Sequence, residues 1–137
     1  NSIKSFGNGA FSSCTSLKTV ILPEGITSIE NGLFSGCINL QNIIIPDKVT
    51  KIGDSAFNTC TNLETVEIPE SIIEIGTYAF NDTALTSVTI PNSVVCIGEQ
   101  AFRDCAQLRY AKIGSGVKYI GELIFYCYKF YVFKVLS

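Results

Sequence analysis

Apolar positions recur along this chain with a long, fixed period. Leucine stands at positions 17, 40, 63, 85 and 108, so that successive leucines are 22 or 23 residues apart. An aliphatic residue (once an alanine) follows each leucine after three, five, nine and twelve positions, and phenylalanine follows it after seventeen. A period in the twenties is typical of a solenoid, in which each repeat forms one coil, or rung, and buries its apolar side only against neighbouring rungs.

The pattern within each repeat predicts short extended segments. In residues 63–68, apolar and polar residues alternate toward a β-branched end, which indicates a half-buried strand. Proline follows this strand at 23, 46, 69 and 91 and ends it, because proline has no N–H to donate to a ladder. A second apolar pair in residues 49–53 predicts a shorter extended piece.

The remaining part of each repeat, such as residues 54–60, is too short for a stable α-helix of its own. We expect a single helical or 3₁₀ turn there, on the convex side. The expected fold class is therefore an α/β-type repeat solenoid. It would be a right-handed curved coil with a parallel β-sheet on its concave face, short strands and single-turn or 3₁₀ helices elsewhere, and rungs about 4.8 Å apart.

The repeat extends over the whole chain, which predicts one domain, residues 1–137. Residues 1–16 fit the end of an earlier rung, and the following rungs occupy residues 17–39, 40–62, 63–84, 85–107 and 108–129. Residues 130–137 fit a terminal strand that places Phe130 in the leucine position, with Phe133 and Val135 three and five positions later. Because both end rungs are incomplete and methionine is absent, we expect a fragment of a longer protein.

The consensus LxxVxIPxxVxxIGxxAFxxCxxL resembles the BspA-type leucine-rich repeat, a family named for a bacterial cell-surface adhesin. The resemblance covers five consecutive rungs, although the fifth has Gly114 in place of proline and the third lacks its cysteine. It implies a surface or secreted microbial protein that binds proteins of a host or a neighbouring cell. An extracellular or cell-surface location is expected on this ground alone, since the chain carries no targeting signal.

Composition and charge narrow the possible partners. The chain is 47% apolar with a net charge of −2, which favours neither nucleic acid nor an anionic membrane as a partner. Its longest uncharged stretches, residues 31–46 and 83–98, are interrupted by polar residues and proline, so no membrane span is predicted. Charge is polarised along the chain, with a net −6 over residues 1–107 and a net +4 over residues 108–137.

A catalytic site is not predicted. Gly53-Asp54-Ser55 matches the surroundings of the nucleophilic serine in one class of esterases, but the chain has no histidine to act as its base. Sister rungs place Gly32, Tyr78 and Gln100 in the position of Ser55, which indicates a surface position of the repeat. We therefore expect no enzyme, no cofactor and no metal.

Five of the six cysteines occupy one position of the repeat: Cys14, Cys37, Cys60, Cys105 and Cys127. A column of this kind does not converge as metal ligands do. In-register side chains also point the same way, whereas a disulfide needs its Cβ atoms about 3.8 Å apart. We predict that the thiols of this column are buried and pack as small apolar groups, and we expect Cys96, which lies outside the column, to be the reactive thiol.

Asn81-Asp82-Thr83 is a glycosylation sequon in a eukaryotic secretory host and is otherwise a turn.

The candidate binding residues lie on the outward side of the predicted strands, on the concave sheet. They are Thr19, Ile21, Asn42, Ile44, Thr65, Glu67, Ser87, Thr89, Arg109, Tyr110 and Lys112. Ile21 and Ile44 predict a small exposed apolar patch, and Arg109, Tyr110 and Lys112 an aromatic-basic patch of the kind found in protein interfaces. The alternative is that such residues stand there because strands favour them.

The C-terminal sequence YCYKFYVFKVLS is rich in aromatic residues. An apolar end of a solenoid either folds over the last rung or pairs with another chain. We predict Phe130, Tyr131 and Phe133 as an edge for self-association.

The predicted function is a non-catalytic protein-binding or adhesion module with a protein partner, and the alternative is a structural spacer without a ligand.

Overall fold

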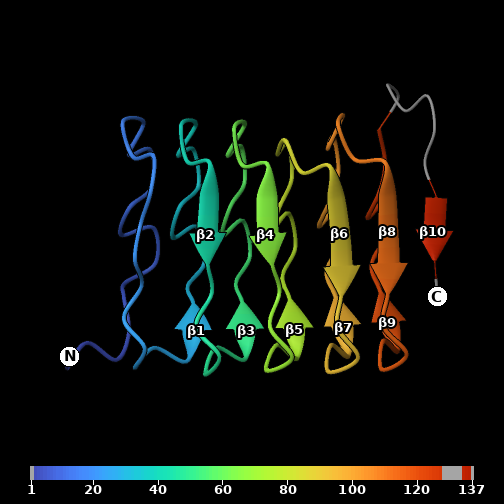
Figure 1. The fold of residues 1–137 in the computed structure, drawn as a ribbon, viewed down its shortest axis with the longest axis horizontal. Helices are drawn as coiled ribbons and strands as arrows, with labels where there is room; N and C mark the ends of the chain where they lie inside the picture. Colours follow the sequence, from blue (N-terminus) through green and yellow to red (C-terminus); the bar gives the residue numbers. More distant parts are fainter. Residues whose placement is uncertain (1, 128–133, 137) are drawn as a thin grey trace.

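The chain forms a stack of parallel strands that lie side by side along one axis (Figure 1). The structure is a computed structural model and describes residues 2–127 and 134–136. The strands in these residues are β1 (Ser28–Ile29), β2 (Asn42–Ile44), β3 (Lys51–Ile52), β4 (Thr65–Glu67), β5 (Glu74–Ile75), β6 (Ser87–Ile90), β7 (Cys96–Ile97), β8 (Tyr110–Ile113), β9 (Tyr119–Ile120) and β10 (Lys134–Leu136).

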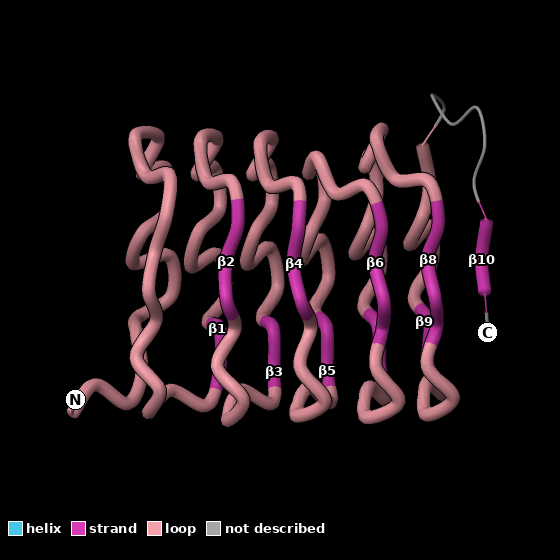
Figure 2. Tube along the Cα trace, in the orientation of Figure 1, coloured by secondary structure: helices cyan, strands magenta, loops and turns pink. Residues whose placement is uncertain are grey.

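The rungs from residues 40–62 to 108–129 each contribute one longer and one shorter strand, which belong to different sheets (Figure 2). Rung 17–39 contributes only β1, so the longer strand predicted at its start does not form. The two-residue strands form a continuous five-stranded parallel sheet in the order β1-β3-β5-β7-β9. Equivalent positions of successive repeats pair in it, as Ile52 does with Ile29 on one side and Ile75 on the other. The predicted parallel solenoid and its second extended segment are therefore confirmed.

The longer strands are interrupted where one rung is a residue short. β2 pairs with β4, and β6, β8 and β10 form a separate three-stranded sheet. The missing residue falls in the turn just before β6, where residues 83–85 replace the four residues 60–63 of the preceding rung. The other sheet passes the same rung without a break, from β3 through β5 to β7. The deletion thus affects the local ladder and leaves the stack intact.

The predicted helical or 3₁₀ turns are wrong. No helix occurs in residues 2–127 and 134–136, and residues 53–60 form consecutive β-turns instead. Every second N–H there donates to the carbonyl three residues back, as Asn58 donates to Ser55 at 3.2 Å. The N–H groups between them donate to the next rung at 2.8–2.9 Å: Ser55 to Thr77, Phe57 to Ala79 and Thr59 to Asn81. A helix would use all these donors internally, whereas the turns leave half of them to hold the rungs together.

The core is a set of ladders formed by equivalent side chains. Phe34, Phe57, Phe80 and Phe102 are fully buried. Their rings stack with centroids 5.2–5.6 Å apart. The leucine, isoleucine and valine positions of the repeat form the rest of the same core. The apolar positions that define the period are therefore those that the stack buries.

The terminal strand forms with a different register from the predicted one. Val135 of β10 pairs with Ala111 of β8, where the repeat alignment places Phe133. The last rung therefore reaches its strand two residues later than the alignment predicts. Phe130, Tyr131 and Phe133 lie outside the described residues.

Each run of turns contains a residue with left-handed backbone. This is the position of Ser55, with a φ of 54°, and it is also occupied by Gly32, Tyr78, Gln100 and Leu123. Left-handed backbone brings Cβ close to a carbonyl oxygen and costs a non-glycine residue about 1 kcal/mol. The position therefore accepts many residue types and favours only glycine.

Replacing Ser55 with glycine is expected to raise the free energy of unfolding by about 1 kcal/mol, because glycine adopts this backbone without the Cβ clash. Urea unfolding followed by circular dichroism measures the change. Ser55→Val is the control and should destabilise the chain, since a β-branched residue tolerates positive φ least. A Ser55→Gly variant no more stable than the parent would show that the backbone carries no strain there.

Candidate binding surface

The outward residues of the longer strands, together with the equivalent Thr19 and Ile21 of rung 17–39, form one exposed surface, which we call the strand face. It consists of Thr19, Ile21, Asn42, Ile44, Thr65, Glu67, Ser87, Thr89, Tyr110 and Lys112. All are exposed except Ser87, which is half-buried, and they alternate with inward residues of the core. Register places them beside one another, as Ile44 beside Glu67 and Thr89 beside Lys112. Arg109 is also exposed, just before β8.

Two isoleucines project from the strand face into solvent. Ile21 is 97% exposed and Ile44 is 82% exposed, although the aliphatic residues on either side of Ile44 are buried and those beside Ile21 are buried or half-buried. A hollow of about 130 Å³ lies beside them and is lined by Val20, Ile21, Leu22, Glu24, Ile44 and Pro46. The structure thus brings both isoleucines to one apolar hollow.

Two larger hollows continue from this one toward the C-terminal end. One of about 560 Å³ is lined by Ile44, Ile45, Asp47, Glu67, Pro69, Glu70 and Ser71. The next, of about 420 Å³, is lined by Val66, Glu67, Ile68, Pro69, Glu70, Ser87, Thr89 and Pro91. Because neighbouring hollows share lining residues, we treat the three as one trough, which crosses β2, β4 and β6.

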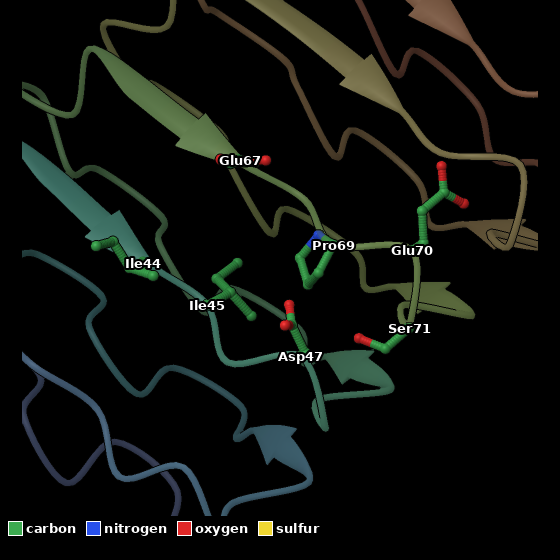
Figure 3. A pocket seen from close by; sticks show the side chains of 7 residues that line it. All are labelled: Ile44, Ile45, Asp47, Glu67, Pro69, Glu70 and Ser71. Atoms are coloured by element: carbon green, nitrogen blue, oxygen red, sulfur yellow. The ribbon is translucent and has the colours of Figure 1, made fainter.

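The trough has one wall on the strand face and the other on the turns that follow the strands. Figure 3 shows Ile44 and Glu67 at the ends of two neighbouring strands, with Pro69 beyond the strand ends and Asp47 and Glu70 on the turns. The strand-face wall was predicted from the sequence. The turn wall was missed, although the residue after each proline forms a visible column of Glu24, Asp47, Glu70 and Asn92.

The aromatic-basic patch lies at the other end of the strand face. Tyr110 is 44% exposed and Lys112 is exposed beside it on β8. Arg109 is turned back toward its own chain, because its Nη1 donates to the carbonyl of Ala106 at 3.3 Å. Tyr110 and Lys112 therefore point outward, whereas part of the Arg109 guanidinium is already hydrogen-bonded within the chain.

Reactive groups do not converge elsewhere in the described part of the chain. Ser55 lies in a turn with left-handed backbone, and residues 2–127 and 134–136 contain no cluster of three metal-ligating side chains. Burial, and then the charge of Asp104 in the next rung, raise the pKa of Asp82. These carboxylates lie on the turn runs, and neither lines the trough.

The cysteine column is buried inside the stack and open at its ends. Cys37, Cys60 and Cys105 are buried, and each thiol donates to a phenylalanine carbonyl of a preceding rung at 3.1 Å. Burial raises the pKa of Cys60 to about 12 and that of Cys105 to about 11. Cys14 is exposed, and Cys96 is only half-buried. Accessibility therefore favours Cys14 over Cys96 as the reactive thiol, contrary to the expectation from the sequence.

Thiol reagents at pH 8 are expected to modify Cys14 fastest and to leave Cys60 and Cys105 unmodified in the folded chain. The reacting species is the thiolate, and burial both excludes the reagent and keeps these two thiols protonated. Mass spectrometry after timed alkylation identifies the modified residues, and the same reaction in denaturant should label all six cysteines. Equal labelling rates for Cys14 and Cys60 in the folded chain would contradict the buried column.

The glycosylation sequon takes part in the packing of its turn. The Asn81 side-chain amide donates to Asn58 Oδ1 at 2.8 Å. Thr83 is 4% exposed and donates to the carbonyl of Phe80 at 3.1 Å. A glycan on the Asn81 nitrogen would have to replace its contact with Asn58, so this geometry favours a structural role.

The stacked parallel coils define a leucine-rich repeat solenoid. The profile of the BspA type leucine rich repeat region matches residues 1–107 and 74–136, with six copies. The chain therefore belongs to the BspA-type leucine-rich repeat family. Proteins of this family are generally interaction or surface proteins, and their fold is typically non-catalytic. No curated protein sequence matches the chain.

Solved structures of bacterial leucine-rich repeat proteins have the same fold. A Bacteroides ovatus leucine-rich repeat protein is 27% identical with a TM-score of 0.75, over 88% of this chain and 43% of its own. The T. pallidum leucine-rich repeat protein is 30% identical with a TM-score of 0.76, over 93% of this chain and 64% of its own.

A leucine-rich cell surface protein from Faecalibacterium prausnitzii, 23% identical, matches in fold with a TM-score of 0.75 over 98% of this chain and 51% of its own. The chain thus spans between 43% and 64% of the length of these proteins. Within the described residues, no helix has the length and apolar character needed to cross a membrane.

Proposed function

We propose that this chain is a non-catalytic protein-binding or adhesion module of a microbial cell-surface or secreted protein. Its protein partner is held on the strand face, the side that the sequence predicts to be concave. The observation that carries the proposal is the pair of exposed isoleucines, Ile21 and Ile44, beside a trough on a face that the fold does not need to bury. Exposed apolar groups of this kind mark interaction sites.

Family and relatives support the same function. The chain belongs to a family of interaction and surface proteins, and one structural relative is a cell surface protein of Faecalibacterium prausnitzii. Solenoids generally bind partners on an extended face, because stacking presents one row of side chains from each repeat. Tyr110 and Lys112 add an aromatic and a basic group at the far end of that face.

A structural spacer is the second candidate. Its supporting observation is that the core ladders and the five-stranded sheet continue through every described rung between β1 and β9, so the stack is regular along its length. A regular stack separates its two ends whether or not its surface binds a ligand. In this case Ile21, Ile44 and Tyr110 stand on the strands only because strands favour such residues.

A library of extracellular protein domains displayed on cells, screened with the full chain as bait, distinguishes the two functions. The binding module should capture a domain, and Ile44→Asp or Tyr110→Ala should weaken that capture at least tenfold, as the loss of a central contact does. Thr61→Ala, an exposed change in a turn outside the strand face, is the control and should leave binding unchanged. A spacer would capture no domain whose binding depends on Ile44 or Tyr110.

Self-association through Phe130, Tyr131 and Phe133 remains a proposal. One edge of β10 is already occupied, because β10 pairs there with β8 of its own chain. Light scattering of the intact chain over a concentration series, compared with a chain that lacks residues 126–137, tests this proposal.

A further inference from the structure

The trough on the strand face combines an apolar end with an acidic middle. Ile21 and Ile44 border its first hollow, and Ile44 also borders the second. Four carboxylates line the three hollows, and no lysine or arginine does: Glu24, Asp47, Glu67 and Glu70. Lys48 is exposed next to Asp47 but does not line the trough. The trough is therefore more acidic than the chain as a whole, whose net charge is −2.

The carboxylates of the middle hollow come from both walls. Glu67 belongs to the end of β4, whereas Asp47 and Glu70 follow the prolines of two successive rungs (Figure 3). All three residues are exposed, and the ion pair nearest in sequence, Lys51 with Glu74 at 3.1 Å, engages other residues. A cationic side chain in this hollow would have carboxylates on two sides.

Charge changes sign farther along the strand face. In the column that contains Ile21, Ile44 and Glu67, the next residues are Thr89 and then Lys112. Thr89 and Lys112 pair in register between β6 and β8. A ligand that lies along the trough therefore meets apolar, acidic and neutral positions in that order, and the basic Lys112 lies beyond the trough on the next strand. This order restricts both the direction and the composition of a ligand.

We propose that the trough binds an extended segment of a partner protein that carries an apolar side chain and, one or two residues away, a lysine or arginine. The proposal rests on the proposed function and specifies its partner. The apolar side chain occupies the hollow beside Ile21 and Ile44, and the cation lies among Asp47, Glu67 and Glu70. The spacing follows because neighbouring rungs are about 4.8 Å apart and an extended chain advances about 3.3 Å per residue.

Other classes of ligand fit this surface less well. A nucleic acid or an anionic membrane would bring negative charge against four carboxylates. A small molecule would find hollows whose four carboxylates belong to exposed residues, whereas an extended peptide follows the row of hollows along its length. Opposite charge on a partner also speeds association, since it steers the two proteins together.

Selection from a phage library of random linear peptides tests the proposal, with the intact chain as bait. We expect the enriched peptides to share an apolar residue with a lysine or arginine one or two positions away. Neutralising two carboxylates, in the double variant E67Q/E70Q, should weaken a selected peptide roughly five- to tenfold, and raising the salt concentration should weaken the parent more than this variant. The matched control is E99Q/E122Q, which removes the same charge from exposed positions outside the trough.

Each result bears differently on the two proposals. Peptides that lose binding with Ile44→Asp but carry no basic residue, or that bind E67Q/E70Q as tightly as the parent, would overturn this inference and leave the proposed function standing. Equal losses in E67Q/E70Q and E99Q/E122Q would also overturn it, because only net charge would then matter. If no enriched peptide depends on Ile44, Glu67 or Glu70, the inference is wrong, and the domain screen alone decides the proposed function.

Discussion

Replacing Phe57 with alanine is expected to lower the free energy of unfolding by about 4 kcal/mol, a large part of the stability of a small domain. Phe57 is fully buried, and its ring stacks on Phe34 at 5.6 Å and on Phe80 at 5.2 Å. The substitution removes a ring from the middle of the ladder and leaves a cavity that the backbone bonds between rungs keep from collapsing. Urea unfolding monitored by circular dichroism measures the loss.

Two further variants identify the cause of that loss. Phe57→Leu keeps most of the volume and should cost only about 1 kcal/mol. Ile44→Ala removes an aliphatic side chain that is 82% exposed, so it should change stability by less than about 0.5 kcal/mol. A loss below about 1 kcal/mol for Phe57→Ala would contradict a core in which the stacked rings hold successive rungs together.

Replacing Gly98 with alanine is expected to destabilise the chain by about 3 kcal/mol, at the upper end of the cost of overpacking. A Cβ atom at this position would lie 2.4 Å from the Thr77 nitrogen and 2.6 Å from the Gly76 carbonyl carbon of the preceding rung. Both atoms belong to the backbone, which cannot move aside without separating the rungs. Urea unfolding again gives the magnitude.

Gly7→Ala is the matched control for this prediction, because nothing lies within 4 Å of a Cβ built at Gly7. It should leave the stability unchanged within about 0.5 kcal/mol. If Gly98→Ala and Gly7→Ala were equally mild, close approach of the rungs would not be the reason for glycine at this position of the repeat.

The binding predictions depend on surface residues and are separable from these core effects. Ile44→Asp and E67Q/E70Q change exposed side chains, so they should alter binding while the unfolding curve stays nearly the same. A variant that loses both binding and stability would not test whether the strand face binds a partner, because unfolding alone would explain its loss of binding. Each binding measurement should therefore be paired with an unfolding measurement.

Much of the fold could be predicted because the repeat places the same residue type at the same position of every rung. The leucine, isoleucine and phenylalanine positions were predicted to be core and are buried in the middle rungs, whereas Ile120 is 54% exposed in the last rung. The strands β2, β4 and β6 each end within two residues of the proline of their rung. The outward positions could be inferred because side chains alternate between inward and outward along an extended segment. For this reason Ile21, Ile44 and Glu67 could be predicted as exposed from the sequence. Their role in binding is a separate matter, which the experiments above decide.

Predictions made from the sequence of a single repeat were wrong where the backbone conformation of one rung depends on contacts with the next rung. Residues 54–60 were expected to form a helical turn, but they form β-turns because alternate N–H groups donate to the following rung. A single repeat contains no information about such donors. For the same reason, the sequence did not reveal why glycine stands at position 98. Gly98 allows close approach to the preceding rung, and it does not have a positive φ.

The sequence by itself determined the period, the solenoid, the buried ladders and the outward face, since each follows from residue type at a fixed spacing. Only the tertiary structure decided the features that arise between rungs. These are the turns that replace helices, the shifted register of Val135, the accessibility of Cys14, and the trough between the strand face and the turns. They depend on which backbone and side-chain atoms of different repeats meet when the rungs stack, and no single repeat specifies those contacts.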